Sequence, residues 1–269
     1  MTLTSNNPSQ GLTNQQHGHP ERIVPDETAP GIVAIHLKRY DFARGYVAGK
    51  HVLDVACGVG YGSHYLSEAA ASVTGLDLDT WSVEYARERY GDRPSVTFEV
   101  GNALDMPFET GQFDVVCSFE TIEHVQDADA FLREVLRVLK PGGVFIVSTP
   151  AARISTQRPD NPHHVQEWSP KDFERLLRNY FADVTIYSQA RRTTRLAEVL
   201  RRLDVFKLRA RVPLAVTRQV AASAGVRTMG DVDLNDIEIR SGVVEGASES
   251  VVVCRRTGDD TPYLYETLR

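Results

Sequence analysis

The chain has 269 residues, of which 42% are hydrophobic and 25% charged, a composition that can bury a substantial core. Its formal net charge of −6 argues against general nucleic-acid binding, and its three cysteines, an odd number without CxxC spacing, argue against a disulfide framework. No apolar run reaches the roughly 18 residues of a membrane span and the polar N-terminal residues lack a signal-peptide core, so we expect a cytoplasmic protein that binds neither nucleic acid nor membranes.

Secondary structure is predicted in chain order from the apolar pattern and the turn residues. After a flexible tail over residues 1–28, a helix is expected over about 31–47. From residue 51 onward short apolar runs alternate with helical patterns, which is typical of a parallel sheet with helices on both faces. The expected strands are 51–56, 72–77, 95–100, 113–119 and 143–149, and the expected helices are 62–70, 80–90 and 127–139.

The last third of the chain adds one more helix and two strands. Ser169 suits the N-cap of a helix and Pro170 its first position, and strands are expected at 183–188 and 249–256. The pattern predicts an α/β fold with a Rossmann-like, seven-stranded, mostly parallel sheet whose last strand is antiparallel. The predicted divisions are the tail 1–28, a core over 29–189, a helical cap insertion over 190–247, and a final strand with C-terminal tail over 248–269.

A glycine-rich stretch follows the first predicted strand in "VLDVACGVGYG". Gly58, Gly60 and Gly62 lie between a strand and a helix, where a loop of bare backbone can approach a ligand closely. The spacing is not that of a dinucleotide fingerprint, because Ser63 stands where the third glycine is required, and the lysine of a phosphate-binding loop is absent. Asp54 would repel a pyrophosphate and suits a cationic amine instead.

An acidic residue ends the second predicted strand in "VTGLDLD". Asp77 follows Gly60 by 17 residues, the place where a carboxylate can accept both hydroxyls of a ribose. The alternative is that Asp77 caps the next helix. With "GNALDMPF", "FDVVCSFETIEHV" and "RVLKPGGVFIVSTP", these two stretches resemble the ordered motifs of class I S-adenosylmethionine-dependent methyltransferases, in the branch that acts on small molecules. The resemblance covers about residues 30–190, and "ERIVP" and "HLKRYDFA" are similar to a subset that methylates sugars and natural products.

The resemblance implies a seven-stranded sheet, S-adenosylmethionine as cofactor and a set of binding residues. By the family pattern Asp54 and Gly58 lie near the methionine part, Asp77 holds the ribose, and Phe119 lies beside the cofactor. The family usually has Asp where this chain has Asn102, whose amide allows a rearranged contact with the adenine. The full set of expected cofactor-binding residues is Asp54, Ala56, Gly58, Gly60, Asp77, Leu78, Asn102, Ala103, Leu104 and Phe119.

Methyl transfer from a sulfonium needs an aligned nucleophile, and an alcohol nucleophile also needs a base. The stretches "ETIEHV" and "NPHHVQEW" follow the fourth and fifth strands, at the sheet edge where such folds bind ligands. We predict His164 as general base, Glu167 as the residue that orients its ring, and His124 as substitute or assistant. Each of these residues could instead only brace its loop. No metal site is predicted, because His163, His164 and Glu167 lack a known ligand spacing.

The predicted function is transfer of a methyl group to a small-molecule acceptor, foremost a hydroxyl of a sugar or natural product. The fourth strand lacks both the Asn/Asp-Pro-Pro-aromatic motif and the Pro-Cys nucleophile of nucleic-acid base methylation. N- or C-methylation of a small metabolite is the alternative, followed by an RNA or protein methyltransferase or a non-catalytic cofactor-binding module. Residues 191–211 contain eight basic residues, which either attract an anionic acceptor or form a solvated helix face. A homodimer is also considered.

Overall fold

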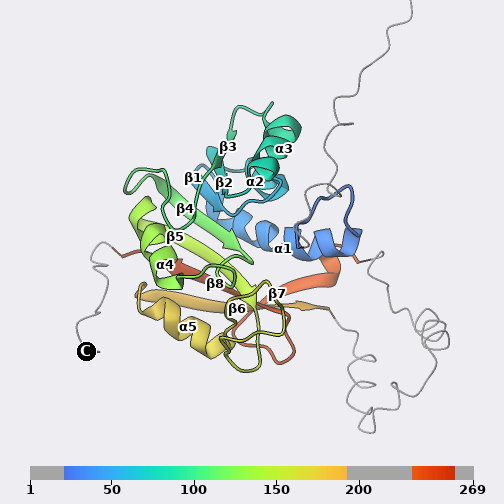
Figure 1. Ribbon diagram of the computed structural model, residues 1–269, viewed down its shortest axis with the longest axis vertical. Coiled ribbons are helices and arrows are strands. Elements are labelled where there is room, and N and C mark those ends of the chain that lie inside the picture. The colour runs from blue at the N-terminus through green and yellow to red at the C-terminus, as the bar shows by residue number, and fades with distance from the viewer. Residues whose placement is uncertain (1–20, 193–231, 258–269) are drawn as a thin grey trace, which may run out of the picture.

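The computed structural model describes residues 21–192 and 232–257 of the chain (Figure 1). Its strands are β1 His51–Val55, β2 Ser72–Asp77, β3 Val96–Val100, β4 Phe113–Phe119, β5 Leu139–Pro150, β6 Asp183–Arg191, β7 Ile237–Ser241 and β8 Glu249–Arg255. Its helices are α1 Pro30–Val47, α2 Tyr61–Leu66, α3 Thr80–Tyr90, α4 Ala128–Val138 and α5 Pro170–Arg178, with a 3₁₀ turn, η4, at Leu234–Asp236. All the strands belong to one sheet of order β3-β2-β1-β4-β5-β8-β6-β7.

The sheet is Rossmann-like, as predicted, and has one strand more than expected. Strands β1 to β5 pair in parallel, whereas β8 lies antiparallel between β5 and β6. The prediction that the last strand is antiparallel is therefore confirmed. The additional strand, β7, pairs antiparallel with β6 at the sheet edge. It lies within the predicted cap insertion 190–247, and residues 193–231 of that insertion are outside the described residues.

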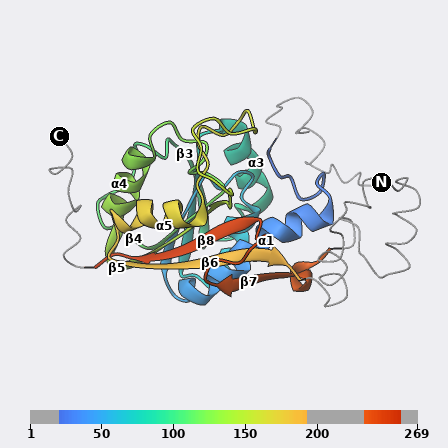
Figure 2. The ribbon, with the colours of Figure 1, turned by 90° about the horizontal axis from the view of Figure 1, so that it is seen from below.

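Helices cover both faces of the sheet (Figure 2). Helices α4 and α5 pack on one face, where Phe131 and Phe173 are fully buried in a cluster with Phe145 of β5. On the other face α1, α2 and α3 supply Tyr40, Leu66 and Ala86 to a second cluster. Because the central strands are buried on both sides, they appear in the sequence as continuous apolar runs.

Helices α3, α4 and α5 begin at residues whose side chains cap them. The Ser169 hydroxyl accepts a hydrogen bond from the backbone N–H of Asp172, with Pro170 in the first turn, as predicted for α5. Asp79 and Asp127 cap α3 and α4 in the same way. The three cysteines are buried free thiols. Among the described residues no helix is long and apolar enough to span a membrane.

Candidate active site

A cavity of about 360 Å³ lies at the carboxyl ends of the parallel strands. Much of its wall is formed by residues at or just after the ends of four strands, β1, β2, β3 and β4. They meet there because parallel strands bring their carboxyl ends to one edge of the sheet. Of the ten expected cofactor-binding residues, six line this cavity. They are Ala56, Gly58, Asp77, Leu78, Asn102 and Ala103.

Glycine is required for different reasons at the three glycine positions between β1 and the start of α2. Gly58 has a φ of +55°, and a Cβ built on it would meet no described atom within 4 Å. At Gly60, with a φ of +82°, a Cβ would lie 2.6 Å from the ring of Phe98. At Gly62 a Cβ would lie 2.0 Å from the ring of Tyr40. Only Gly58 offers bare backbone to the cavity, and the other two glycines permit close packing.

Asp77 is held by the backbone on both of its carboxylate oxygens. Its Oδ2 accepts from the N–H of Gly58 (2.7 Å) and its Oδ1 from the N–H of Asp79 (2.9 Å). A carboxylate has about four lone-pair positions, so each oxygen can accept one hydroxyl in addition. Burial raises the pKa of Asp77, and the two N–H groups oppose that shift. The helix cap is Asp79, not Asp77, because the Asp79 side chain accepts from the N–H of Ser82.

Asp54 is fully buried and faces the helices on its side of the sheet. Its Oδ2 accepts from the Ser63 hydroxyl (2.6 Å) and its Oδ1 from the Tyr40 hydroxyl (3.3 Å). Burial raises its pKa to about 7. Asp54 is not among the residues that line the cavity, so a contact with the methionine amine stays a prediction.

Three further expected residues also lie outside the cavity lining: Gly60, Leu104 and Phe119. Phe119, at the end of β4, packs edge-on against Tyr40 with ring centroids 4.8 Å apart. The N–H of Leu104 donates to Oδ1 of Asn102 at 2.9 Å. The amide oxygen of Asn102 is therefore already engaged within its own turn.

Two residues without glycine's freedom adopt left-handed backbone at the cavity. Ala56 has a φ of 57° and Glu120 a φ of 53°, and both line the cavity. This conformation costs an L-residue about 1–2 kcal/mol, and such strain concentrates at functional sites. Glu120 Oε1 accepts from the Ser148 hydroxyl at 2.7 Å, which ties the turn after β4 to β5. Glu120 belongs to the stretch "ETIEHV" but was not among the predicted catalytic residues.

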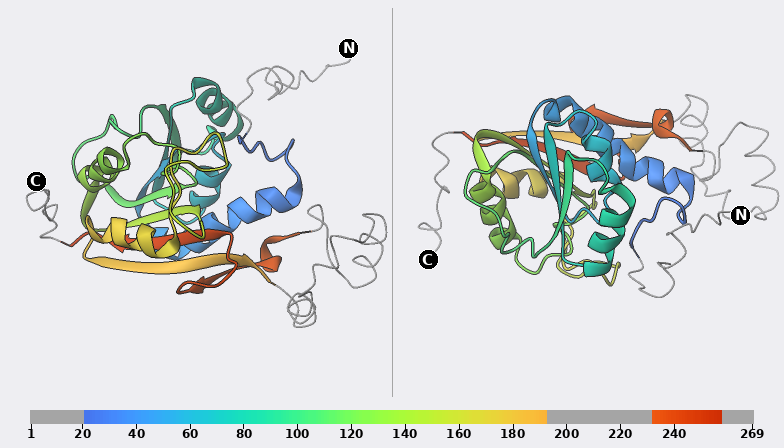
Figure 3. Two further views of the ribbon diagram at one scale, coloured as in Figure 1. Left: turned by 60° about the horizontal axis from the view of Figure 1, so that its bottom comes forward. Right: turned by 90° about the horizontal axis from the view of Figure 1, so that it is seen from above.

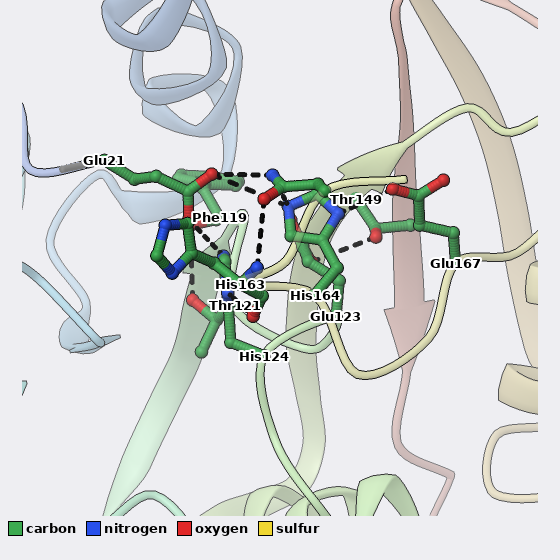
Figure 4. A network of polar contacts seen from close by, with 10 residues as sticks. Glu21, Phe119, Thr121, Glu123, His124, Thr149, His163, His164 and Glu167 are labelled. Atoms are coloured by element: carbon green, nitrogen blue, oxygen red, sulfur yellow. Dashed lines mark hydrogen bonds and ion pairs between the residues drawn. The ribbon is translucent and has the colours of Figure 1, made fainter. Parts of the chain in front are cut away.

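The loop after β5 brings histidines and a glutamate to the same edge (Figure 4). Backbone hydrogen bonds between Thr156 and Glu167 fix the loop, and the N–H of Val165 donates to the carbonyl of Glu123 after β4. Glu123 itself is fully buried, and burial followed by the charge of Glu120 raises its pKa well above the ordinary value. Glu123 thus connects the two loops.

The three predicted catalytic residues are brought together, but only His124 lines the cavity. The Nδ1–H of His124 donates to the carbonyl of His163 at 3.0 Å. The Nδ1–H of His164 donates to Oε1 of Glu167 at 2.6 Å, so the predicted pairing of these two side chains is present. The rings of His124 and His164 lie 4.8 Å apart, edge to face.

The segment that precedes α1 is the blue loop before the blue helix in Figure 3. Its residue Glu21 completes this group of side chains (Figure 4). Its Oε2 lies 3.8 Å from His124 Nε2 and its Oε1 lies 3.9 Å from His164 Nε2. Burial raises the pKa of Glu21, but the Asn161 hydrogen bond and the nearby histidines lower it more. Burial lowers the pKa of His124. The sequence gives no signal for Glu21, because it stands about a hundred residues from the nearest partner.

A glycine loop, an acidic residue at the end of β2 and a cavity between them define a Rossmann-like protein that binds a nucleoside-containing cofactor. The methyltransferase domain family matches residues 53–147. A protein of Mycolicibacterium smegmatis named "Probable S-adenosylmethionine-dependent methyltransferase" is 36% identical over 180 residues, which are 60% of this chain and 67% of that protein. The chain belongs to the S-adenosylmethionine-dependent methyltransferases, and its cofactor is S-adenosylmethionine.

Other similar proteins support the family and the fold. A Mycobacterium tuberculosis protein with the same kind of name is 32% identical over 170 residues, which are 58% of each chain. A SAM-dependent methyltransferase of Thermotoga maritima has a TM-score of 0.59 at 16% identity, covering 85% of this chain and 92% of that one. The [4+2]-cyclase SpnF has a TM-score of 0.54 at 20% identity, covering 82% and 81%. One fold thus serves proteins with different names, and the reaction has to be argued from the site.

The cavity residues fit S-adenosylmethionine. Gly58 presents backbone with open space where a Cβ would stand, and Asp77 keeps lone pairs that can accept hydroxyl groups. Asn102 and Ala103 line the same cavity beyond Asp77.

Proposed function

We propose that the protein methylates a hydroxyl of a small-molecule acceptor, foremost a sugar or a natural product. The observation that carries the proposal is the position of His124 on the cavity wall. Its Nδ1 is a donor to a backbone carbonyl, so Nε2 bears the lone pair. A hydroxyl nucleophile must lose a proton, whereas an amine needs less help from a base. A basic group at this edge of the cavity therefore favours an oxygen acceptor.

The residues of the cavity divide between the cofactor and the acceptor. When bound, S-adenosylmethionine supplies a methyl group that the sulfonium already activates. We assign the cofactor to Gly58, Asp77 and Asn102, and the acceptor oxygen to the side of the cavity that His124 lines. His164 lies behind His124, and its hydrogen bond to Glu167 fixes its ring. Direct proton transfer to His164 stays a prediction.

Names of similar proteins support a small-molecule acceptor. They include a fatty-acid O-methyltransferase of Mycolicibacterium smegmatis, 39% identical over 115 residues, and norajmaline N-methyltransferase of Rauvolfia serpentina, 37% identical over 108 residues. The second name keeps N-methylation as the competing proposal. An anionic acceptor, a homodimer and a cytoplasmic location stay predictions, and residues 193–211 of the basic stretch lie outside the described residues.

The test is a comparison of acceptors with different nucleophilic atoms. The full chain is incubated with isotope-labelled S-adenosylmethionine and, separately, methyl glycosides, a phenolic natural product, a free fatty acid and phosphoethanolamine. Mass spectrometry then locates the label on oxygen or nitrogen. We expect labelled ethers from a glycoside or the phenol, and a turnover loss of about 10²- to 10⁴-fold in His124→Ala while S-adenosylhomocysteine still binds. Label found only on nitrogen would refute the proposal.

A further inference from the structure

Three electron-pair donors converge beside the cofactor cavity (Figure 4). They are the carboxylate of Glu21 and the Nε2 atoms of His124 and His164, with one ligand atom from each residue lying within 4.8 Å of the others. The residues come from three separate segments: the one before α1, the turn after β4 and the loop after β5. The amide nitrogen of Asn161 bridges two of them, Glu21 and His164.

The hydrogen bonds around the two imidazoles fix which nitrogen carries the proton. The Nδ1 of His124 faces a carbonyl and the Nδ1 of His164 faces a carboxylate, and both partners can only accept. At His164 the amide nitrogen of Asn161 also lies 2.9 Å from Nε2 and donates to it. Both Nε2 atoms therefore present lone pairs. An Nδ1–H held by a carbonyl or a carboxylate is the arrangement that orients histidines which bind metals.

Neither Nε2 atom makes a direct hydrogen bond to Glu21, and toward His164 the amide nitrogen of Asn161 stands between the two groups. The separations of 3.8 Å and 3.9 Å between the Nε2 atoms and the Glu21 oxygens exceed the range of an N–H···O bond. With metal–ligand distances of about 2.1 Å, a separation near 3.8 Å corresponds to a ligand–metal–ligand angle of roughly 130°. The two histidines approach different oxygens of Glu21, and a contraction of a few tenths of an ångström would bring each of these two angles near the tetrahedral value. The amide N–H groups of Asn161 point their positive ends at Glu21 and His164. The cation would take the place of these N–H groups.

We propose that Glu21, His124 and His164 bind one divalent transition-metal cation at the edge of the cofactor cavity. Two imidazoles and one carboxylate leave a fourth position, as in catalytic zinc sites, and imidazole ligands favour Zn²⁺, Co²⁺ and their neighbours over Mg²⁺. The role of this cation rests on the proposed function: an acceptor hydroxyl in the fourth position has its pKa lowered by the cation. The hydroxyl proton would then pass to solvent, because Nε2 of His124 would be a ligand of the cation and would not take the proton itself.

The N-terminal segment that carries Glu21 is attached to α3 by the next residue. Arg22, next to Glu21, pairs with the cap residue Asp79 at 2.5 Å and lies over the ring of Trp81. Both Glu21 and Arg22 line the cofactor cavity. A cation on Glu21 would therefore join the segment, the turn after β4 and the loop after β5 at one point.

Cation binding is measured directly, without acceptor or cofactor. The full chain is freed of metal with a chelator and titrated with Co²⁺, followed by its visible absorption, and with Zn²⁺ by calorimetry. We expect one equivalent to bind with the absorption of a low-coordinate Co²⁺ site. Glu167→Gln should weaken binding about 10- to 100-fold, because it removes the charge that orients His164, and His164→Ala and Glu21→Gln should weaken it more.

A matched control is His163→Ala, which removes a neighbouring imidazole that is not among the three ligands. It should bind the cation as the wild type does, and far-ultraviolet circular dichroism checks that each variant is folded. Absence of binding to folded wild type, or equal binding by His164→Ala and wild type, would overturn the proposal. The proposed function can fail separately. If the protein binds Co²⁺ but methylates only nitrogen, the cation site stands and the proposal of an oxygen acceptor is refuted.

Discussion

Replacing either of two glycines in the loop after β1 by alanine adds one methyl group. We expect one replacement to affect mainly cofactor affinity and the other mainly the stability of the fold. Gly58→Ala and Gly60→Ala both place an alanine in left-handed backbone, with φ of +55° and +82°. That conformation costs about 1–2 kcal/mol of folding free energy in each variant. The surroundings of the two methyl groups differ, so the remaining effects should fall on different measurements.

At Gly60 the methyl group would lie 2.6 Å from Phe98 and 2.7 Å from the Cβ of Ala86. Overpacking of this kind costs about 1–3 kcal/mol, so Gly60→Ala should lose about 2–5 kcal/mol of stability in all. At Gly58 the methyl group meets no described atom within 4 Å and stands at the cavity. Gly58→Ala should therefore lose only the backbone cost of about 1–2 kcal/mol.

Cofactor affinity should respond in the opposite order. A methyl group on the cavity wall at Gly58 overlaps a ligand that touches bare backbone, at a cost of about 1–3 kcal/mol. This corresponds to a rise of about 5- to 150-fold in the Kd for S-adenosylhomocysteine. Urea unfolding measures the stability of each variant, and calorimetry measures the affinity. If folded Gly58→Ala binds S-adenosylhomocysteine like the wild type, Gly58 does not contact the cofactor and the reasoning is refuted.

Three more predictions concern single carboxylates. Asp77→Ala leaves the two ribose hydroxyls without their charged acceptor and should weaken S-adenosylhomocysteine binding by about 2–4 kcal/mol in calorimetry; unchanged affinity in a folded variant would exclude Asp77 from the ribose site. Burial raises the pKa of Asp54 to about 7, so the folded state keeps a proton that the unfolded state releases near pH 4. Asp54 therefore contributes stability that is fully present below pH 4 and is lost as the pH rises to about 7, by about 4 kcal/mol at most. Between pH 5 and pH 8 the free energy of unfolding, measured with urea, should fall less for Asp54→Asn than for the wild type. Equal falls would contradict the raised pKa of Asp54. Glu167→Gln should reduce turnover less than His164→Ala, because Glu167 only positions the ring of His164; pH–rate profiles compare the two, and a larger loss in Glu167→Gln would reverse the roles.

Much of the sheet could be predicted because its signals are local. The strands 72–77 and 113–119 were predicted at their observed bounds. Strand β4 is buried on both faces and is mostly apolar, whereas in β2 the apolar residues Val73 and Leu76 are buried among partly buried neighbours. Ser169 and Pro170 marked the start of α5 through capping chemistry that needs only neighbouring residues. Strand β7 gave no comparable signal, because this short edge strand is partly exposed and pairs only with β6. The pairing of β7 depends on the position of β6 in the folded sheet.

The sequence by itself determined the family, the cofactor and the sheet edge at which ligands bind. Motif order and strand periodicity are local patterns that can be recognised from neighbouring residues along the chain. Only the tertiary structure decided which side chains reach the cavity. Asp54 stands two residues before Ala56, yet it is buried against Tyr40 while Ala56 lines the cavity. Glu21 and His124 meet because separate segments fold to the same edge. Side-chain direction and contacts between distant segments arise from packing, which local sequence patterns do not encode.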